Sequence, residues 1–160
     1  ENAVFRRISS DALDADFSHG IVRNTSFFGC GNDALDTSGS EIHIENIFWN
    51  GIGDKGISAG EKSQIFVDTL VGKNSRIAVA SKDQSKVFIQ NAKVENSQIG
   101  FASFRKKSEF GPGTIEVENL EMNNLETPFL VEKDSKLKIN GVPITSWRRN
   151  VGKLLYDGNL

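Results

Sequence analysis

An asparagine that returns at 22-residue intervals constrains the fold of this chain more than any other feature of its sequence. Asn2, Asn24 and Asn46 are each 22 residues apart. The series continues after steps of 23, 22, 28 and 22 residues, at Thr69, Asn91, Asn119 and Gly141. A fixed period of roughly 20–50 residues is typical of solenoids, propellers and other repeat arrays. The chain is therefore expected to repeat one structural unit along its length.

Each repeat has the alternating pattern of a β-strand with one buried face. Ile42 and Ile44 precede Asn46, and Val87 and Ile89 hold the same places two coils later. A second set of apolar residues forms one inward column over the repeats: Leu13, Leu35, Ile57, Val79, Phe101 and Leu130. Alternation of this kind indicates strands rather than helices. Each coil is therefore predicted to hold about three short strands, separated by turns rich in Gly, Asn and Ser.

Stacked coils place equivalent residues about 4.8 Å apart in parallel sheets. Phe5, Phe27 and Trp49 are then expected to form an internal aromatic stack. The recurring asparagines are expected to form a ladder, in which each side-chain amide bonds to the next and satisfies buried polar groups. The single Cys30 falls at a core position and rules out an internal disulfide. The predicted fold class is all-β, a parallel β-helix solenoid of about six to seven coils of about 22 residues.

The repeat has two irregularities near its C-terminal end. The extra residues of the 28-residue step fall near 104–113, and insertions in solenoids become surface loops, often on the binding face. The repeat ends near residue 145, so residues 1–145 are predicted to form the β-helix and residues 146–160 a capping tail. Trp147 is expected to cover the apolar end of the last coil. Because Asn2 already holds a ladder position, the chain is also expected to be a piece of a longer protein.

Three groups of residues resemble the right-handed parallel β-helix of the pectate-lyase-like superfamily, with its PbH1-type repeats. They are Gly31-Asn-Asp-Ala-Leu-Asp-Thr37, Gly53-Asp-Lys-Gly-Ile-Ser58 and the Ile-x-Ile-x-Asn strands, and the resemblance covers residues 2–144. Similar phrases occur in β-helix domains of large secreted or surface bacterial proteins. The resemblance implies carbohydrate chemistry on an external sheet. Lyases of this superfamily often combine calcium-binding Asp residues with a Lys or Arg that acts as the base. The chain lacks the Asn-Thr-Asp, Asp-Asp and Gly-His-Gly sequences of the polygalacturonase-like hydrolases, which disfavours that activity.

Acidic residues gather in the first three coils, on the outward side of one predicted strand. Leu13 and Leu35 point inward there, so Asp14 and Asp36 must point outward and stack, with Ser58 next. Two flanking columns are formed by Asp11, Asp33 and Lys55 and by Asp16, Ser38 and Gly60. In later coils the place of Asp14 is expected to be taken by Ala80, Ala102 and Val131. The candidate site is therefore confined to the N-terminal coils.

Stacked carboxylates disfavour joint ionisation, and three outcomes remain open. One carboxyl of the pair Asp14 and Asp36 holds a proton and acts as an acid beside a base, as glycoside hydrolysis requires. Alternatively, calcium binds the hard oxygen ligands of Asp11, Asp14, Asp33 and Asp36. In the third outcome Lys55 and solvent screen the charges, and the patch is only a soluble surface. The resemblance to lyases would make Lys55 the catalytic base.

Two further surfaces are candidates for ligand contact. Phe66 and Phe88 hold the outward position between two core residues in adjacent coils and would form an exposed aromatic pair. This pair is expected to stack on sugar rings or to bury against a partner chain, unless a loop covers it. Arg105 and Lys106 lie in the insertion and are expected to contact an acidic glycan, unless the insertion is only a charged surface loop.

The leading prediction of function is recognition of an extracellular polysaccharide by the acidic sheet, with Asp16 and Asp33 among the sugar ligands and calcium as the candidate cofactor. A polysaccharide lyase or glycoside hydrolase on the same sheet and a rigid spacer in a surface protein are the alternatives, so catalysis is left open. The expected partner is a polysaccharide or the remainder of the parent polypeptide, and the expected location is secreted or cell-surface. A net charge of −2 implies no nucleic-acid partner, and no run of 18 apolar residues exists that could span a membrane.

Overall fold

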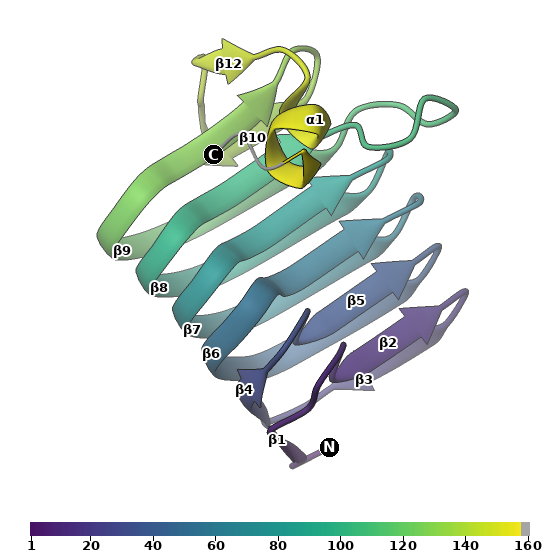
Figure 1. Cartoon of the computed structure of the whole chain (residues 1–160), viewed down its shortest axis with the longest axis vertical. Coiled ribbons are helices and arrows are strands. Elements are labelled where there is room, and N and C mark those ends of the chain that lie inside the picture. The colour runs from purple at the N-terminus through teal and green to yellow at the C-terminus, as the bar shows by residue number, and fades with distance from the viewer. Residues whose placement is uncertain (158–160) are drawn as a thin grey trace.

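The structure, a computed structural model, describes residues 1–157. It is a parallel β-solenoid of about six turns with a repeat of about 22 residues, which confirms the predicted fold class (Figure 1). Within the described residues the elements are β1 (Val4–Arg6), β2 (Leu13–Asp16), β3 (His19–Val22), β4 (Thr25–Cys30), β5 (Leu35–Ser38), β6 (Glu41–Gly60), β7 (Gln64–Lys82), β8 (Lys86–Phe104), β9 (Thr114–Glu132), β10 (Lys136–Ile139), β11 (Val142–Pro143), β12 (Trp147–Arg148) and α1 (Val151–Tyr156).

The strands stack in the register that the repeat predicts. β2 pairs in parallel with β5 and places Asp14 opposite Asp36, and β5 pairs with β6 and places Asp36 opposite Ser58. Between β8 and β9 the offset grows to 28 residues, so that Asn91 lies opposite Asn119. The extra residues form a loop that leaves the stack between these two strands, as predicted. A constant period therefore converts spacing in the sequence into contact in space.

The strands of the middle coils are longer than predicted. β6 has 20 residues, and β7, β8 and β9 have 19 each, so one strand runs around most of a coil. Single residues in the left-handed conformation turn the backbone at a corner, such as Asn74, Asn96 and Asn124 with φ of 54°, 53° and 54°. Asparagine enters this conformation more readily than most residues. The prediction of three short strands per coil therefore holds for the N-terminal coils, where β1 to β5 have 3–6 residues. It was wrong for the middle coils, because one left-handed residue bends the strand there without a long turn.

A narrow aromatic and aliphatic core fills the inside of the coils. Phe5 stacks on Phe27 with ring centroids 5.0 Å apart, and Phe27 lies in register with the fully buried Trp49. The predicted stack is thus confirmed for Phe5 and Phe27, and Trp49 follows them in register. The indole of Trp49 occupies space that glycines leave free, since a Cβ on Gly56 or Gly72 would lie 2.2 or 2.3 Å from its Cζ2 atom. Glycines in the same coil and in the next one are therefore a condition for the largest side chain of the core.

The predicted asparagine ladder exists, but it lies at an exposed corner. Asn24 Nδ2 donates to Asn2 Oδ1 at 3.2 Å, and Asn46 Nδ2 donates to Asn24 Oδ1 at 2.9 Å. Asn119 Nδ2 donates to Asn91 Oδ1 at 3.1 Å in the same way. All five side chains are exposed to solvent. The expectation that the ladder satisfies buried polar groups was therefore wrong, and these amides instead join neighbouring coils at the surface.

The C-terminal segment folds back over the outer face of the solenoid (Figure 1). β12 adds a rung to the end of β9, and α1 packs beside it. An apolar cluster outside the main core joins the helix to the strands and contains Ile77, Ala80, Ile99, Ala102, Phe104, Leu130, Val151 and Leu155. Trp147 is 53% exposed, so the prediction that it covers the apolar end of the last coil was wrong, and α1 covers the outer cluster. Residues 158–160 of the predicted tail lie outside the described residues.

The register of the last coil differs from the one predicted from the sequence. Phe129 lies opposite Phe101, whereas Leu130 lies opposite Ala102 on the outward side. Leu130 is apolar because α1 packs on it, and this made it look like a core residue in the sequence. Val131 accordingly lies opposite Ser103 and outside the column of Asp14 and Asp36. The 28-residue offset is thus constant along the whole of β9.

Candidate functional site

The candidate site lies on the outer face of one set of paired strands, which we call the site ladder. The site ladder consists of β2, β5 and residues 55–60, 77–82, 99–104 and 127–132 of the four long strands. Its outward side chains are mainly polar in the first three coils and mainly apolar in the later ones, where α1 covers them. The uncovered half contains the predicted acidic patch and ends beside the helix (Figure 1).

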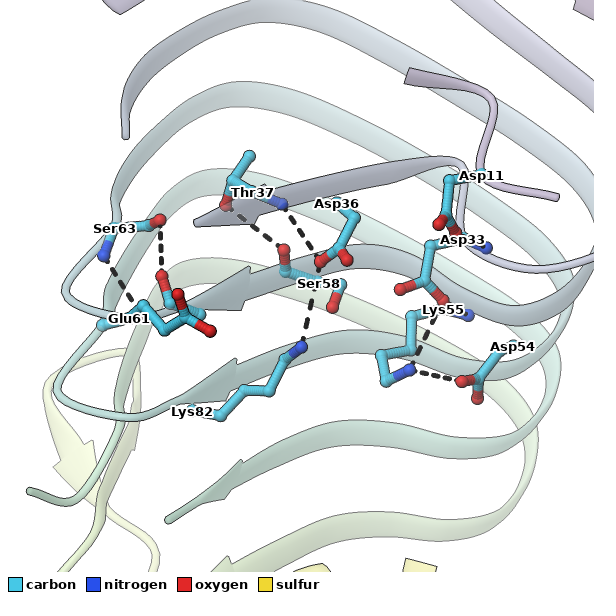
Figure 2. Close-up of polar contacts among 12 residues, drawn as sticks. Asp11, Asp33, Asp36, Thr37, Asp54, Lys55, Ser58, Glu61, Ser63 and Lys82 are labelled. Atoms are coloured by element: carbon cyan, nitrogen blue, oxygen red, sulfur yellow. Dashed lines mark hydrogen bonds and ion pairs between the residues drawn. The ribbon is translucent and has the colours of Figure 1, made fainter. Parts of the chain in front are cut away.

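The central column of this half carries a carboxylate next to an unsatisfied hydroxyl. Asp36 Oδ1 accepts a hydrogen bond from the backbone N of Thr37 at 3.1 Å and lies 3.8 Å from Lys82 Nζ. Ser58 follows Asp36 in the column, and its Oγ is fully buried without a hydrogen-bond partner in residues 1–157. Figure 2 shows the Ser58 hydroxyl beside the line that joins Asp36 and Lys82. Buried hydroxyls are normally paired, so this one has capacity for a ligand or a water.

Lys82 is the main residue of the site that the sequence interpretation missed. Its side chain is 10% exposed and reaches back over Gly60, where an added Cβ would lie 3.6 Å from Nζ. Burial lowers the pKa of Lys82, and the nearby Asp36 only partly opposes this. Lys82 comes 22 residues after Gly60, in the column that Asp16 begins. The repeat register therefore contained the signal that could have placed this lysine in the site.

A buried ion pair lies along one side of the site. Asp33 Oδ1 accepts a hydrogen bond from the backbone N of Lys55 at 2.9 Å and lies 3.4 Å from its Nζ, which also pairs with Asp54. Burial raises the pKa of Asp33 to about 6, although the charge of Lys55 opposes the shift. Burial alone would lower the pKa of Lys55, but Asp33, Tyr156 and Asp54 outweigh it and raise the pKa to about 12. The column was predicted correctly, whereas the burial of both charges was not.

This ion pair does not favour the catalytic role proposed for Lys55. A general base works best when its pKa is close to the working pH, and Lys55 stays protonated far above it. The polar atoms of Lys55 and Asp33 already pair with each other, and Lys55 also pairs with Asp54, so neither is free for a substrate. Lys82, whose pKa is lowered, is the better base candidate on this face. The assignments of Lys55 as a base and Asp33 as a sugar ligand remain predictions without geometric support.

The exposed acidic residues repel one another. Partial burial raises the pKa of Asp14, and the charges of Asp16, Asp36 and Asp11 add to the effect. Asp14 and Asp16 form no ion pair within residues 1–157, and both are exposed. This arrangement fits an acid–base pair of Asp14 and Asp36 in one respect only, the raised pKa of Asp14. The pair remains a prediction.

The expected calcium site is not assembled from the residues described. Within residues 1–157, no group of three or more His, Cys, Asp or Glu side chains is placed to hold a metal ion. Asp11 Oδ1 accepts hydrogen bonds from Asn32 Nδ2 at 2.7 Å and from the backbone N of Asp33 at 2.9 Å. Asp33 Oδ1 accepts a hydrogen bond from the backbone N of Lys55. Of the other two expected ligands, Asp14 is exposed and Asp36 is half-buried, and they lie opposite each other in the paired strands. Calcium binding therefore remains a prediction.

The predicted aromatic pair lies on another part of the solenoid. Phe66 and Phe88 stack with centroids 5.5 Å apart, and His43 extends the stack at 4.8 Å from Phe66. Because the rings face one another along the solenoid axis, Phe66 has both flat faces in the stack and Phe88 has one. This geometry does not favour stacking of Phe66 on a sugar ring, which requires a free face. The structure does not bring these residues together with Asp14 and Asp36.

An exposed aromatic ring that the sequence interpretation overlooked lies next to the acidic patch. Phe17 follows Asp16 at a corner with φ of 47°, and it is 79% exposed. Its ring rests against Gly39 of the next coil, where an added Cβ would come within 2.8 Å of Phe17 Cδ1. At the opposite border, the ring of Tyr156 lies 5.7 Å from Lys55 Nζ and 4.6 Å from Lys106 Nζ. The uncovered half of the site ladder is thus bordered by two aromatic side chains.

The stability of the fold is expected to fall with rising pH because of Asp33. Its pKa in the folded chain is about 6, above the value of 3.8 for the unfolded chain, so folding takes up a proton between these values. The stabilisation is complete below the unfolded pKa and is lost as the pH rises through about 6, by up to roughly 3 kcal/mol. Denaturant unfolding of the wild type and of Asp33→Asn from about pH 4 to about pH 7 measures the effect. The wild-type stability minus that of the variant should decrease over this range, and a constant or increasing difference would contradict the assignment.

Comparisons with known proteins add no identification. No family model matches the chain. No curated protein matches it significantly, and no solved structure does. No helix within residues 1–157 is long and apolar enough to cross a membrane. The functional interpretation therefore depends on the chemistry of the site ladder.

Proposed function

We propose that this chain recognises a neutral extracellular polysaccharide through the uncovered half of the site ladder. The proposal includes membership of the right-handed, pectate-lyase-like β-helices that the sequence resembles, and a secreted or cell-surface location. The observation that carries it is the cluster of Asp36, Ser58 and Lys82, whose polar atoms have unused hydrogen-bonding capacity on one outer face (Figure 2).

A sugar hydroxyl fits the spacing within this cluster. The distance of 3.8 Å between Asp36 Oδ1 and Lys82 Nζ is too long for a direct hydrogen bond. A hydroxyl group both donates and accepts, so one placed beside the pair would donate to Asp36 and accept from Lys82. A neighbouring hydroxyl of the same sugar would pair with Ser58 Oγ after a shift of the flexible Lys82 side chain that keeps Nζ on the first hydroxyl. Adjacent hydroxyls at a fixed spacing are the defining polar feature of a sugar ring.

The charge of the surface favours a neutral or amino-substituted glycan over a polyuronate. Asp14 and Asp16 are exposed, and the raised pKa of Asp14 reflects mutual repulsion as well as partial burial. A chain of carboxylates would add to this repulsion, whereas hydroxyl groups would donate to the carboxylates. Hydrogen bonds to ionised acceptors are stronger than those between neutral groups.

The two bordering aromatic residues support the same class of ligand. Phe17 presents a ring with one side against Gly39 and the other open to solvent. Tyr156 lies at the far border and is 42% exposed. Open aromatic faces suit the apolar C–H faces of sugars, in the way that they suit other apolar surfaces. The acidic residues and the rings together provide both kinds of contact that a sugar needs.

Substitution of Asp36 is expected to weaken glycan binding about tenfold or more. A glycan array of neutral, amino and acidic oligosaccharides first identifies the ligand, and calorimetry then compares wild type, Asp36→Asn and Ser58→Ala. Asp36→Asn removes a charge-assisted hydrogen bond worth about 1.5–3 kcal/mol, which corresponds to about tenfold or more in affinity. Ser58→Ala should weaken binding less, because a neutral hydroxyl contributes less.

The matched control is Asp68→Asn, which makes the same charge change at an exposed position away from the site ladder. It should bind like the wild type, and an equal loss in this variant would indicate only a general charge effect. Running each titration with calcium and with a chelator separates the calcium prediction from direct recognition. Binding of no oligosaccharide under either condition would contradict the proposal and favour a rigid spacer. Release of unsaturated sugar ends from alginate or pectate would instead favour a lyase.

A further inference from the structure

We infer that a second site, at the C-terminal end of the solenoid, binds an oxyanion such as sulfate or phosphate. A pocket of about 210 Å³ lies there, away from the acidic patch. Its lining consists of Arg105, Pro112, Glu132, Lys133, Asp134, Arg149 and Asn150. The inference is independent of the polysaccharide proposal, since none of these residues belongs to the cluster of Asp36, Ser58 and Lys82.

Three separate segments of the chain are held together around this pocket by Glu132. Its Oε2 accepts a hydrogen bond from the backbone N of Arg105 at 2.7 Å, where the insertion leaves β8. Its Oε1 accepts one from the backbone N of Val151 at 3.0 Å, where α1 begins. The backbone N of Lys133 also donates to the carbonyl of Arg148 at 2.9 Å. Backbone bonds therefore hold the walls of the pocket, and the basic side chains are mounted on fixed positions.

Three basic side chains of the pocket have no carboxylate partner among the described residues. Some exposed or half-exposed cations elsewhere do pair with carboxylates, at Lys73, Arg76, Lys93, Lys107 and Lys138. Others, such as Arg7 and Lys86, form no ion pair within residues 1–157 but do not gather around a pocket. Arg105, Lys133 and Arg149 make no ion pair with the residues that the structure describes. The lining has three cations and two carboxylates, and both oxygens of Glu132 are committed to backbone donors. The pocket therefore has an excess of positive charge without a counterion.

An oxyanion satisfies this arrangement better than other small ligands. The guanidinium groups of Arg105 and Arg149 offer planar pairs of N–H donors, which match the oxygens of sulfate, phosphate and carboxylate groups. The pocket volume is several times the roughly 30 Å³ that one water occupies in the liquid, so a tetrahedral anion fits. Arg105 was expected to contact an acidic glycan together with Lys106. Lys106 instead lies over Tyr156, and Lys133 and Arg149 complete the pocket.

Titration of the ¹⁵N-labelled chain with inorganic sulfate and inorganic phosphate, at constant ionic strength with chloride, tests the inference by NMR. Saturable shifts are expected for the backbone amides of residues 105, 133 and 149. Arg149→Gln should weaken binding about fivefold or more, because it removes the positive charge and the paired N–H donors of the guanidinium group. Arg148→Gln is the matched control, since Arg148 is the adjacent exposed arginine and does not line the pocket.

The outcomes separate the inference from general attraction of anions. Linear, non-saturating shifts, or equal losses in the Arg148→Gln and Arg149→Gln variants, would overturn it. Asp36→Asn should bind sulfate like the wild type, so failure of the polysaccharide proposal leaves this result unaffected. A sulfated monosaccharide is then compared with inorganic sulfate. Tighter binding of the sugar indicates that the natural anion is a substituent of a glycan. Equal or weaker binding indicates a free anion. Either result is consistent with the proposed site.

Discussion

Replacing Trp49 with alanine is expected to destabilise the solenoid by about 3–5 kcal/mol, the range found for large aromatic residues in closed cores. Trp49 is fully buried and lies between Phe27 in one coil and Gly72 in the next. Removal of the indole leaves a cavity that the neighbouring coils cannot close, because their spacing is set by continuous hydrogen bonding between parallel strands. Equilibrium unfolding in urea, followed by circular dichroism, measures the loss.

A second substitution at the same place separates packing from hydrogen bonding. Trp49 Nε1 is buried and has no hydrogen-bond partner in residues 1–157. Trp49→Phe keeps most of the buried ring and removes this unsatisfied donor, so it should cost much less than Trp49→Ala. Trp147→Ala is the control, since Trp147 is 53% exposed and its loss should change stability by less than about 0.5 kcal/mol. Equal effects of Trp49→Ala and Trp147→Ala would contradict the assignment of Trp49 to the core.

Replacing Asp33 with alanine at neutral pH is expected to cost about 3 kcal/mol, the lower end of the range for a broken buried ion pair. The variant loses the acceptor for the backbone N of Lys55 and leaves the Lys55 ammonium buried with less compensation. The loss stays at the lower end because Asp54 still pairs with Lys55 Nζ. Urea unfolding of the variant beside Asp16→Ala, an exposed acidic control, measures the difference.

The double variant Asp33→Leu with Lys55→Met decides whether this cost comes from the unpaired charge. Replacement of both charges by apolar groups of similar size is often neutral or stabilising, whereas removal of one partner is not. The double variant should therefore be more stable than Asp33→Ala. If it is equally unstable, the loss has another origin, such as the packing of Tyr156 near Lys55.

The arrangement of the site ladder shows how far the sequence alone could predict the site. The columns that contain Asp14, Asp36 and Ser58 were predicted correctly, because a constant 22-residue period places equivalent residues opposite each other. Lys82 obeys the same period, but it was not recognised because its long side chain reaches to another rung. Which side chains are buried was harder to predict. Asp33 and Lys55 look like surface residues in the sequence, yet both are buried beside Asp54 and near Tyr156.

The sequence by itself determined the parallel stacking, the coil length and the register, since these depend only on the period and on alternation along each strand. The extent of the site depended on tertiary structure. In the sequence Ala80 and Ala102 look like a simple loss of the acidic column and Leu130 looks like a core residue, and only the fold shows that α1 packs on this outward cluster. The same holds for the pocket at Arg105, Lys133 and Arg149, which three distant segments build around Glu132. A repeat predicts contacts between equivalent residues, but it contains no information about a segment outside the repeat that folds back across it.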